Sequence, residues 1–437
     1  MAKGLITAMK TQKILFKLKN YFLGILCRHR ADYHSQKKSY VKAIRNYTKA
    51  IRADKRDFVL YSDRGCAYLD SGEPKKALAD FNKGLELEPT NAILYSNRGD
   101  AYADLEDFKR AFPDYNKAIK LDPKLACAYS NRGQAHVETG DLKAAIQDLD
   151  LAIKLDSTST ASYLNRGWAH YEQAEMEKAE KDFMKALELE PGSAAARGSL
   201  GQVYQIMELP DKAIDQYSHI IKSEPKSGFA YNNRGLLYQE KGEMEKAYND
   251  FIKALKLSPN ESGIYNNLGL LFMHLEGQAK TALEAFTDAL RMQPDNGLYL
   301  SNRGEAYLHA EKPKLALKDF NKAIELDPER GLYYCGRGMT YYVLGNLQEA
   351  LSDFNRAMKL EPAASELLCN RALVYTDLEN YTAALADYTA AIKLDSKCAY
   401  AYYNRGAIYQ DMGRYQLAKE DTAKAYKIDP TIGQEAA

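Results

Sequence analysis

Small and aromatic residues recur along this chain at a fixed interval of 34 residues. The string Asn-Arg-Gly occurs six times, and the slot of its glycine can be followed from residue 31 to residue 406, with alanine as the only replacement. One interval is 35 residues long, between Gly269 and Gly304, which places one inserted residue near Gly277. A period of this length is typical of repeat architectures. The pattern predicts twelve tandem units.

The units tile residues 24–432. We number the residues of each unit from 1, which places the glycine slot at position 8. Residues 1–23 then form a basic amphipathic N-terminal segment, and residues 433–437 form a short tail. The predicted repeats are 24–57, 58–91, 92–125, 126–159, 160–193, 194–227, 228–261, 262–296, 297–330, 331–364, 365–398 and 399–432.

Each unit has the pattern of two helices joined by a turn. Position 20 is alanine in all twelve units, and small residues at positions 8 and 20 allow two helices to approach closely. Aromatic side chains at positions 11 and 24 fill the space beside them. Glycines such as Gly72 and Gly140 mark the turn, and proline at position 32 in nine units is expected to end the second helix. A helical hairpin cannot bury its own apolar face, so we expect neighbouring hairpins to stack.

This pattern resembles the tetratricopeptide repeat family, with an Asn-Arg-Gly variant of the repeat. The resemblance implies an all-α fold, a right-handed α-solenoid (superhelix) of about twelve helix-turn-helix repeats. It also implies that the first helices line a concave groove. Three departures from the family pattern stand out: arginine at position 7 in ten units, Arg197 at position 4 and Thr422 at position 24. The last departure makes the final helix polar, at Gln416, Lys419, Glu420, Asp421 and Lys424, so we expect it to face water.

The arginines at position 7 coincide with aspartates at position 23. The two units with leucine at position 7, Leu200 and Leu268, have Gln216 and Ala285 in place of the aspartate, and Arg30 faces Asn46. An unpaired charge between packed helices is costly, so we predict structural ion pairs within each hairpin rather than across neighbours. The predicted pairs are Arg64–Asp80, Arg98–Asp114, Arg132–Asp148, Arg166–Asp182, Arg234–Asp250, Arg303–Asp319, Arg337–Asp353, Arg371–Asp387 and Arg405–Asp421.

The charge distribution argues against nucleic acid as a partner. The chain has 60 basic and 59 acidic residues, whereas phosphate binding needs a basic surface. Residues 1–30 carry seven basic and no acidic side chains, which leaves 53 basic against 59 acidic residues, a net charge of −6, in the remainder. The basic segment, extended to residue 26, has three interpretations that stay open: a cap on the first repeat, peripheral contact with an anionic membrane, or a targeting segment.

No catalytic motif is present in the sequence. It lacks a phosphate-binding glycine loop, a zinc-protease helix motif and a nucleophile elbow. The carboxylates recur with the repeat, which is typical of a scaffold rather than of a tuned acid–base pair. His274 and His309 occupy position 13 of adjacent units, but no further ligand accompanies them, so we predict no metal and no cofactor. The six cysteines show no paired spacing, which is typical of free thiols in a reducing compartment.

The groove is therefore the candidate site. Position 6 is asparagine in eight units, a ladder similar to that in the repeats of the O-linked N-acetylglucosamine transferase, which implies that these amides hold a ligand backbone. Bonding within the repeat is the alternative for the same residues. Acidic residues recur at position 13, and Trp168 with Tyr171 is either an anchor for a partner or packing. The candidate groove residues are Asn97, Asn131, Asn165, Asn233, Asn267, Asn302, Asn370, Asn404, Trp168, Tyr171, Glu172, Asp104, Glu138 and Glu240.

These observations favour a non-enzymatic scaffold or adaptor that binds basic or extended segments of partner proteins. Two alternatives stay open: a membrane-docked receptor or targeting adaptor that uses residues 1–26, and a regulatory subunit of a separate enzyme. The expected location is the cytoplasm, including the surface of a membrane or of a cytoskeletal structure. The sequence identifies neither the partner nor the oligomeric state.

Overall fold

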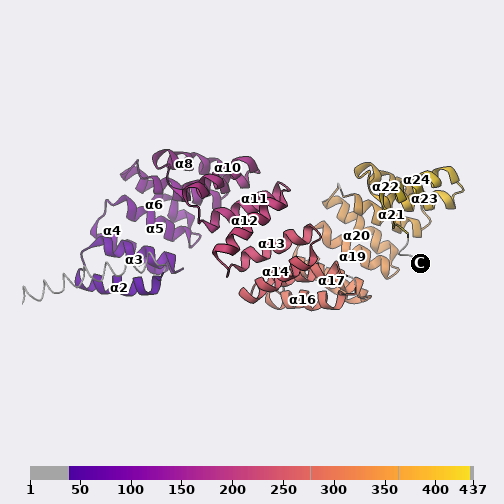
Figure 1. The fold of residues 1–437 in the computed structure, drawn as a ribbon, viewed down its shortest axis with the longest axis horizontal. Coiled ribbons are helices and arrows are strands. Elements are labelled where there is room, and N and C mark those ends of the chain that lie inside the picture. The colour runs from indigo at the N-terminus through magenta and orange to yellow at the C-terminus, as the bar shows by residue number, and fades with distance from the viewer. Residues whose placement is uncertain (1–38, 276, 363, 434–437) are drawn as a thin grey trace, which may run out of the picture. The chain divides into compact units, whose positions relative to one another are not determined.

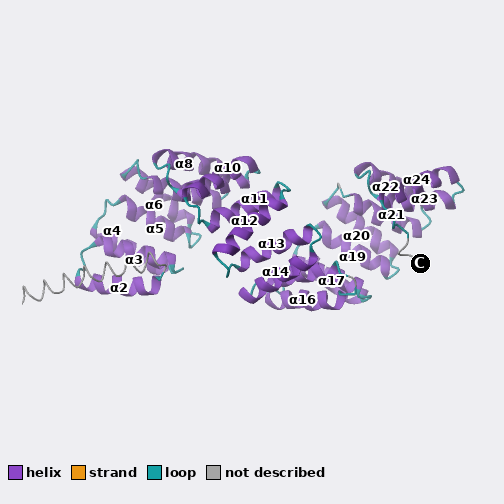
Figure 2. Ribbon diagram, viewed as in Figure 1, coloured by secondary structure: helices purple, strands orange, loops and turns teal. Residues whose placement is uncertain are grey.

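The computed structural model describes residues 39–275, 277–362 and 364–433, and all regular structure in these ranges is helical (Figure 2). The predicted segment 1–23 and the pairing partner Arg30 lie outside the described residues. No helix in the described ranges is long and apolar enough to cross a membrane.

The chain divides into two compact units after Ser223, and each is described by itself. The first contains α2 (Tyr40–Ala53), α3 (Phe58–Asp70), α4 (Pro74–Leu87), α5 (Ala92–Ala103), α6 (Phe108–Leu121), α7 (Ala126–Glu138), α8 (Leu142–Leu155), α9 (Thr160–Glu172), α10 (Met176–Leu189), α11 (Ala194–Ile206) and α12 (Pro210–Ser223) (Figure 1).

The second compact unit begins at Glu224. It contains α13 (Gly228–Glu240), α14 (Met244–Leu257), α15 (Ser262–Met273), α16 (Ala279–Met292), α17 (Gly297–His309), α18 (Pro313–Leu326), α19 (Gly331–Val343), α20 (Leu347–Leu360), α21 (Ser365–Asp377), α22 (Tyr381–Leu394), α23 (Ala399–Asp411) and α24 (Tyr415–Ile428).

Consecutive helices pack in pairs, and each pair is one hairpin of the repeat, with an odd-numbered first helix and an even-numbered second helix. Within each unit, a first helix also contacts the first helix of the next hairpin, as α5 does with α7 and α17 with α19. The first helices thus form a continuous side of each unit, which we call the first-helix face. The all-α solenoid fold expected from the sequence is confirmed.

In α15–α16 Gly277, with φ +71°, makes the turn; in the ten other complete hairpins a left-handed residue at position 15 makes it. Five of these residues are glycines, such as Gly72 with φ +73°, and five are not, such as Ala174 with φ +58°. At Gly72 the turn closes with two backbone bonds, from Gly72 N–H to Leu69 O and from Glu73 N–H to Tyr68 O, both 2.8 Å. This arrangement satisfies the last carbonyls of the first helix.

Proline is not required to end the second helices. α8 and α22 have serine at position 32 and still end at position 30, as the proline-containing helices do. In both, the aspartate at position 31 accepts a bond from the backbone two residues on, such as Thr158 N–H to Asp156 Oδ1 at 2.9 Å. These side-chain turns supply an alternative to the helical bond, so the helix can end at this position without the proline at position 32.

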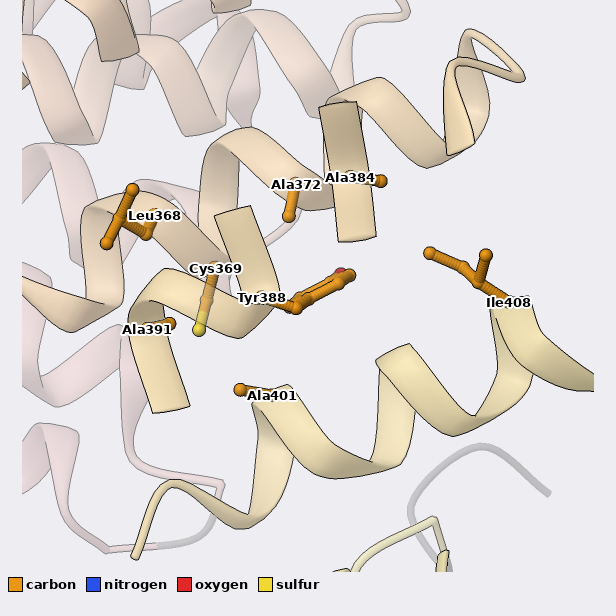
Figure 3. Packing of buried hydrophobic residues seen from close by; sticks show 8 residues of the cluster. All are labelled: Leu368, Cys369, Ala372, Ala384, Tyr388, Ala391, Ala401 and Ile408. Atoms are coloured by element: carbon orange, nitrogen blue, oxygen red, sulfur yellow. The ribbon is translucent and has the colours of Figure 1, made fainter. Parts of the chain in front are cut away.

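The core follows the repeat. The position-20 alanines are fully buried in every described hairpin except the last, where Ala418 is 6% exposed. A Cβ added to Gly167 would lie 2.5 Å from Cε1 of Phe183, so the ring at position 24 packs directly on the backbone of position 8. Figure 3 shows the corresponding packing in α21–α23, where position 8 is Ala372 and position 24 is Tyr388. The Tyr388 side chain lies among Cys369, the alanines and Ile408.

The polar final helix conforms only in part to the expectation that it faces water. Gln416, Lys419, Glu420 and Lys424 are exposed, but Asp421 is 7% exposed because it faces Arg405 of α23. The Arg405–Asp421 pair expected from the sequence accounts for this burial.

Candidate functional site

Each hairpin of the common type holds an arginine of its first helix against an aspartate of its second helix. In all nine pairs expected from the sequence, Nε and Nη2 of the arginine donate to the two carboxylate oxygens at 2.6–2.9 Å. The carboxylates are buried. This fork geometry is the strongest form of charge-assisted bond that a protein makes.

A third bond of the arginine reaches the preceding hairpin, which the sequence analysis missed. Nη1 of Arg166 donates to Asp150 at 2.6 Å, and Nη1 of Arg98 donates to Asn82 at 2.8 Å. The expectation of pairing within a hairpin rather than across neighbours is therefore incomplete, because the carboxylate is local and the third acceptor is not. Equivalent bonds from Arg64, Arg132, Arg303, Arg337, Arg371 and Arg405 reach Thr48, Asn116, Thr287, Asn321, Asn355 and Thr389.

A sequence signal for this contact exists at position 25. The hairpins that precede Leu200 and Leu268 have Met184 and Ile252 there, whereas those that precede an arginine have a polar residue. In these two places the arginine, its aspartate partner and its third acceptor are therefore all replaced together. Comparing the residues of adjacent units, rather than the residues within one unit, would have revealed this contact from the sequence.

Tyrosine rings complete the surroundings of the guanidinium groups. Arg64 lies 5.9 Å from the ring centroids of both Tyr61 and Tyr68, one turn before and after it on α3. The hydrogen bonds that the arginines donate to the carboxylates raise the pKa of the arginines, so the groups stay charged. An arginine in such a cage has few donors left for a phosphate, which agrees with a structural role.

The asparagine ladder is bonded within the protein. Asn302 is buried and its Nδ2 donates to Asn266 Oδ1 at 2.8 Å, and Asn131 Nδ2 donates to Asp100 at 2.7 Å. Asn233 and Asn404 instead donate to the carbonyl four residues earlier on their own helix. The others donate to the preceding first helix: Asn97 to Cys66, Asn165 to Gln134, Asn267 to Asn232 and Asn370 to Cys335.

Within the described residues, the eight ladder amides act as donors only. No described side chain or backbone group donates to their Oδ1 atoms. One N–H thus fixes the orientation of each amide, and the oxygen and second N–H keep their capacity for a ligand where solvent reaches them. Seven of the eight side chains are half-buried, and Asn302 is buried.

A cavity of about 500 Å³ lies on the first-helix face of the second unit. It is formed by α17, α19 and α21, together with the turn before α21. The ladder residue Asn370 lines it, but Glu305 at position 9 was not predicted. Burial, followed by the charge of Glu366, raises the pKa of Glu305. The other lining residues are Leu308, His309, Leu332, Cys335, Gly336, Met339, Glu361, Ala364, Glu366 and Leu367.

A smaller cavity of about 130 Å³ lies at the equivalent place in the first unit, between α5 and α7. It brings together the predicted residues Asp104, Asn131 and Glu138 around Asp100, again at position 9. Asp100 accepts bonds from Tyr115 Oη at 2.8 Å and from Asn131 Nδ2. Burial raises the pKa of Asp100 to about 7 despite these two donors, so this carboxyl exchanges a proton near neutral pH.

The aromatic pair is half-buried and packs within its own hairpin. Trp168 lies edge-on to Tyr171 at 5.1 Å and to Phe183 of α10 at 5.6 Å between ring centroids. Neither lines one of the two cavities on the first-helix face, and Glu172 and Glu240 are exposed and also lie outside them.

Cysteine and histidine chemistry is limited in the described part of the chain. Burial raises the pKa of the Cys66 and Cys335 thiols to about 12, which makes both poor nucleophiles at neutral pH. His274 and His309 are exposed, and the described residues contain no group of three or more histidine, cysteine or acidic side chains suited to hold a metal ion.

Comparisons with known proteins agree with the geometry. Family models described as tetratricopeptide repeat or TPR repeat match residues 65–106, 99–140, 128–159, 160–193, 229–261, 298–330, 331–364, 372–413 and 399–432. The matched ranges leave out 194–228 and 262–297, which contain the two leucine hairpins.

The comparison with curated proteins gave no match. Among solved structures, the chain is similar to the crystal structure of the APC/C hetero-tetramer Cut9-Hcn1, with a TM-score of 0.53 and 15% sequence identity over 94% of this chain and 95% of that chain. At this identity the similarity shows the fold alone.

Proposed function

Because the chain belongs to the tetratricopeptide repeat family, we propose that it is a non-enzymatic scaffold that binds extended segments of partner proteins along its first-helix face. A scaffold of stacked hairpins offers long surfaces whose side chains repeat in register with an extended peptide. No catalytic group takes part in this function.

The observation that carries the proposal is the position of the two cavities. Both lie on the first-helix face, one in each unit, and each is lined by a carboxylate at position 9 and an asparagine at position 6. Concave sites with a few convergent polar groups are where proteins bind ligands. The arginines, in contrast, are occupied by aspartates between the helices of each hairpin.

The amide ladder is the second element of the proposal. Each amide has an Oδ1 atom without a described donor, and the peptide backbone of a partner supplies N–H groups. Such contacts read the backbone and not the side chains, so the ladder contributes affinity and the cavities contribute selectivity.

Asn233 offers the sharpest test, because it bonds only to its own helix and no neighbouring hairpin depends on it. Peptides are selected on the full chain from a random-peptide display library, and their affinities are measured by fluorescence anisotropy. Asn233→Ala together with Asn404→Ala should weaken binding of peptides that reach these positions by about tenfold, since two amide contacts are lost.

Asn249→Ala is the matched control, since Asn249 is an exposed asparagine on α14, the second helix of the same hairpin. It should leave peptide affinity unchanged. Equal affinity of the groove variant and the control variant, with unchanged thermal stability in both, would contradict the proposed function.

A further inference from the structure

The larger cavity combines apolar walls with an excess of negative charge. Leu308, Leu332, Met339 and Leu367 contribute its apolar surface, and Glu305, Glu361 and Glu366 contribute three carboxylates. No lysine or arginine lines it. A ligand that fits both features has an aliphatic stem and a cationic end.

The three carboxylates have no cationic partner among the described residues. None of them forms an ion pair or a hydrogen bond there, unlike the acidic residues of the second helices, many of which pair with a lysine or arginine close by. Glu305 is the innermost of the three, and burial, followed by the charge of Glu366, disfavours its charged form. A cation placed between them removes this repulsion.

The cavity lies where the asparagine ladder is interrupted. Position 6 of this hairpin is Gly336, and a Cβ there would lie 2.2 Å from Cε1 of Phe320. The ring of Phe320 therefore fills the space beside Gly336, and Asn370 of the next hairpin is the ladder amide that lines the cavity.

We propose that this cavity binds a lysine or arginine side chain of a partner segment. The stem lies against Met339 and the leucines, and the ammonium or guanidinium group lies between Glu305 and Glu366. This inference rests on the proposed function, because the side chain belongs to a segment held along the first-helix face. It names the residue type that the second unit selects.

The smaller cavity in the first unit is a natural contrast. It also contains three carboxylates, but it has about 130 Å³ and no leucine or methionine in its lining. It therefore lacks the surface that an aliphatic stem covers, and the proposal does not extend to it.

The test uses the full chain with ¹³C-methyl methionine, because Met339 reports on the cavity directly and Met339→Leu identifies its signal. The probes are the N-acetyl methylamides of lysine, arginine, norleucine and citrulline, together with putrescine as a free diamine. Lysine and arginine should shift the Met339 signal to saturation. Norleucine and citrulline, which lack the charge, should bind at least about fivefold more weakly.

Glu305→Gln together with Glu366→Gln should remove the preference for the charged probes, while Glu325→Gln on the exposed side of α18 should not. Equal binding of norleucine and lysine would overturn the proposal, as would a Met339 signal that no probe shifts. Tighter binding of putrescine than of lysine would also overturn it, since the site would then select free amines.

These outcomes are distinguishable from failure of the proposed function. If display-selected peptides bind through Asn233 and Asn404 but Met339 does not respond, the scaffold function holds and the basic-residue site is wrong. If Met339 responds to lysine but no peptide depends on the ladder, the site holds and the scaffold function is wrong.

Discussion

Two neighbouring hairpins of the first unit, α9–α10 and α11–α12, hold their helices together differently. In α9–α10, Arg166 forms a fork with Asp182 and reaches back to Asp150. In α11–α12, the same position is Leu200, which is 2% exposed, and the residue facing it across the hairpin is Gln216. The backbone of the two hairpins is the same in length and helix boundaries.

The second hairpin keeps an arginine, one turn earlier. Arg197 takes the position that is tyrosine in most units, and its Nη1 donates to Gln216 Oε1 at 3.2 Å while Nη2 donates to Pro191 O. Met184 replaces the polar third acceptor. The side chains at positions 7, 23 and 25 must therefore fill the space between the packed helices. Either a charged network or an apolar contact does so.

The largest expected effect comes from removing one member of the network. Asp182→Ala leaves Arg166 partly buried without its carboxylate and should lower the local free energy of unfolding by about 2–4 kcal/mol, a range reduced because the arginine is 21% exposed. Gln216→Ala in the next hairpin should cost less than about 1 kcal/mol, since no charge is left unpaired. Native-state hydrogen exchange of α9 to α12 measures both, and equal costs would contradict the comparison.

The contact between a glycine and an aromatic ring in the core is common to both hairpins. Substitutions of this glycine should therefore destabilise both hairpins to a similar extent. A Cβ added at Gly167 meets Phe183 at 2.5 Å, and one added at Gly201 meets Tyr217 at 2.6 Å. Gly167→Ala and Gly201→Ala should each cost about 1–3 kcal/mol by overpacking. Thermal denaturation checks this, and a cost at only one of the two sites would show that the hairpins also differ in their cores.

The turns offer a smaller effect of the opposite sign. Ala174 and Glu208 both have left-handed backbones, with φ of +58° and +55°. Ala174→Gly and Glu208→Gly should each stabilise the chain by about 0.5–1 kcal/mol, because glycine adopts this conformation without strain. Thermal unfolding of both variants measures it, with Gly140→Ala, at φ +81°, expected to have the reverse effect.

The smallest effect is expected when the whole network is exchanged. Asp150→Met, Arg166→Leu and Asp182→Gln together give this network the residues found one repeat later, at Met184, Leu200 and Gln216. Replacing a complete buried network by apolar residues is near neutral, so the triple variant should differ from the parent chain by less than about 1 kcal/mol. A loss as large as that of Asp182→Ala would show that the leucine arrangement depends on Arg197 as well.

The hairpins and the nine ion pairs were accessible from the sequence because repetition displays them many times. A residue type that changes only when its partner changes is visible without any structure, as Leu200 with Gln216 shows. The third acceptors escaped notice because they belong to the preceding hairpin. The helix ends were assigned to proline because nine units have one, although Asp156 produces the same end without it.

The cavities were not predictable in the same way. Asp100 and Glu305 occur at a position where most units have another residue, so no periodic signal marks them. Their importance follows from burial and from the side chains of neighbouring first helices, which only the stacked structure brings together. The position-13 acids, which do recur, contribute Asp104 and Glu138 to a cavity but leave Glu172 and Glu240 on the exposed surface.

A double-mutant cycle on Arg166 and Asp182 tests the central claim most directly, namely that these charges hold a hairpin together and take no part in binding. Arg166→Leu, Asp182→Gln and the double variant are compared by hydrogen exchange of α9 and α10 and by affinity for display-selected peptides. The account predicts a coupling energy of about 2–3 kcal/mol in stability and unchanged peptide affinity. Additive costs in stability, or a loss of peptide affinity in the well-folded double variant, would contradict it.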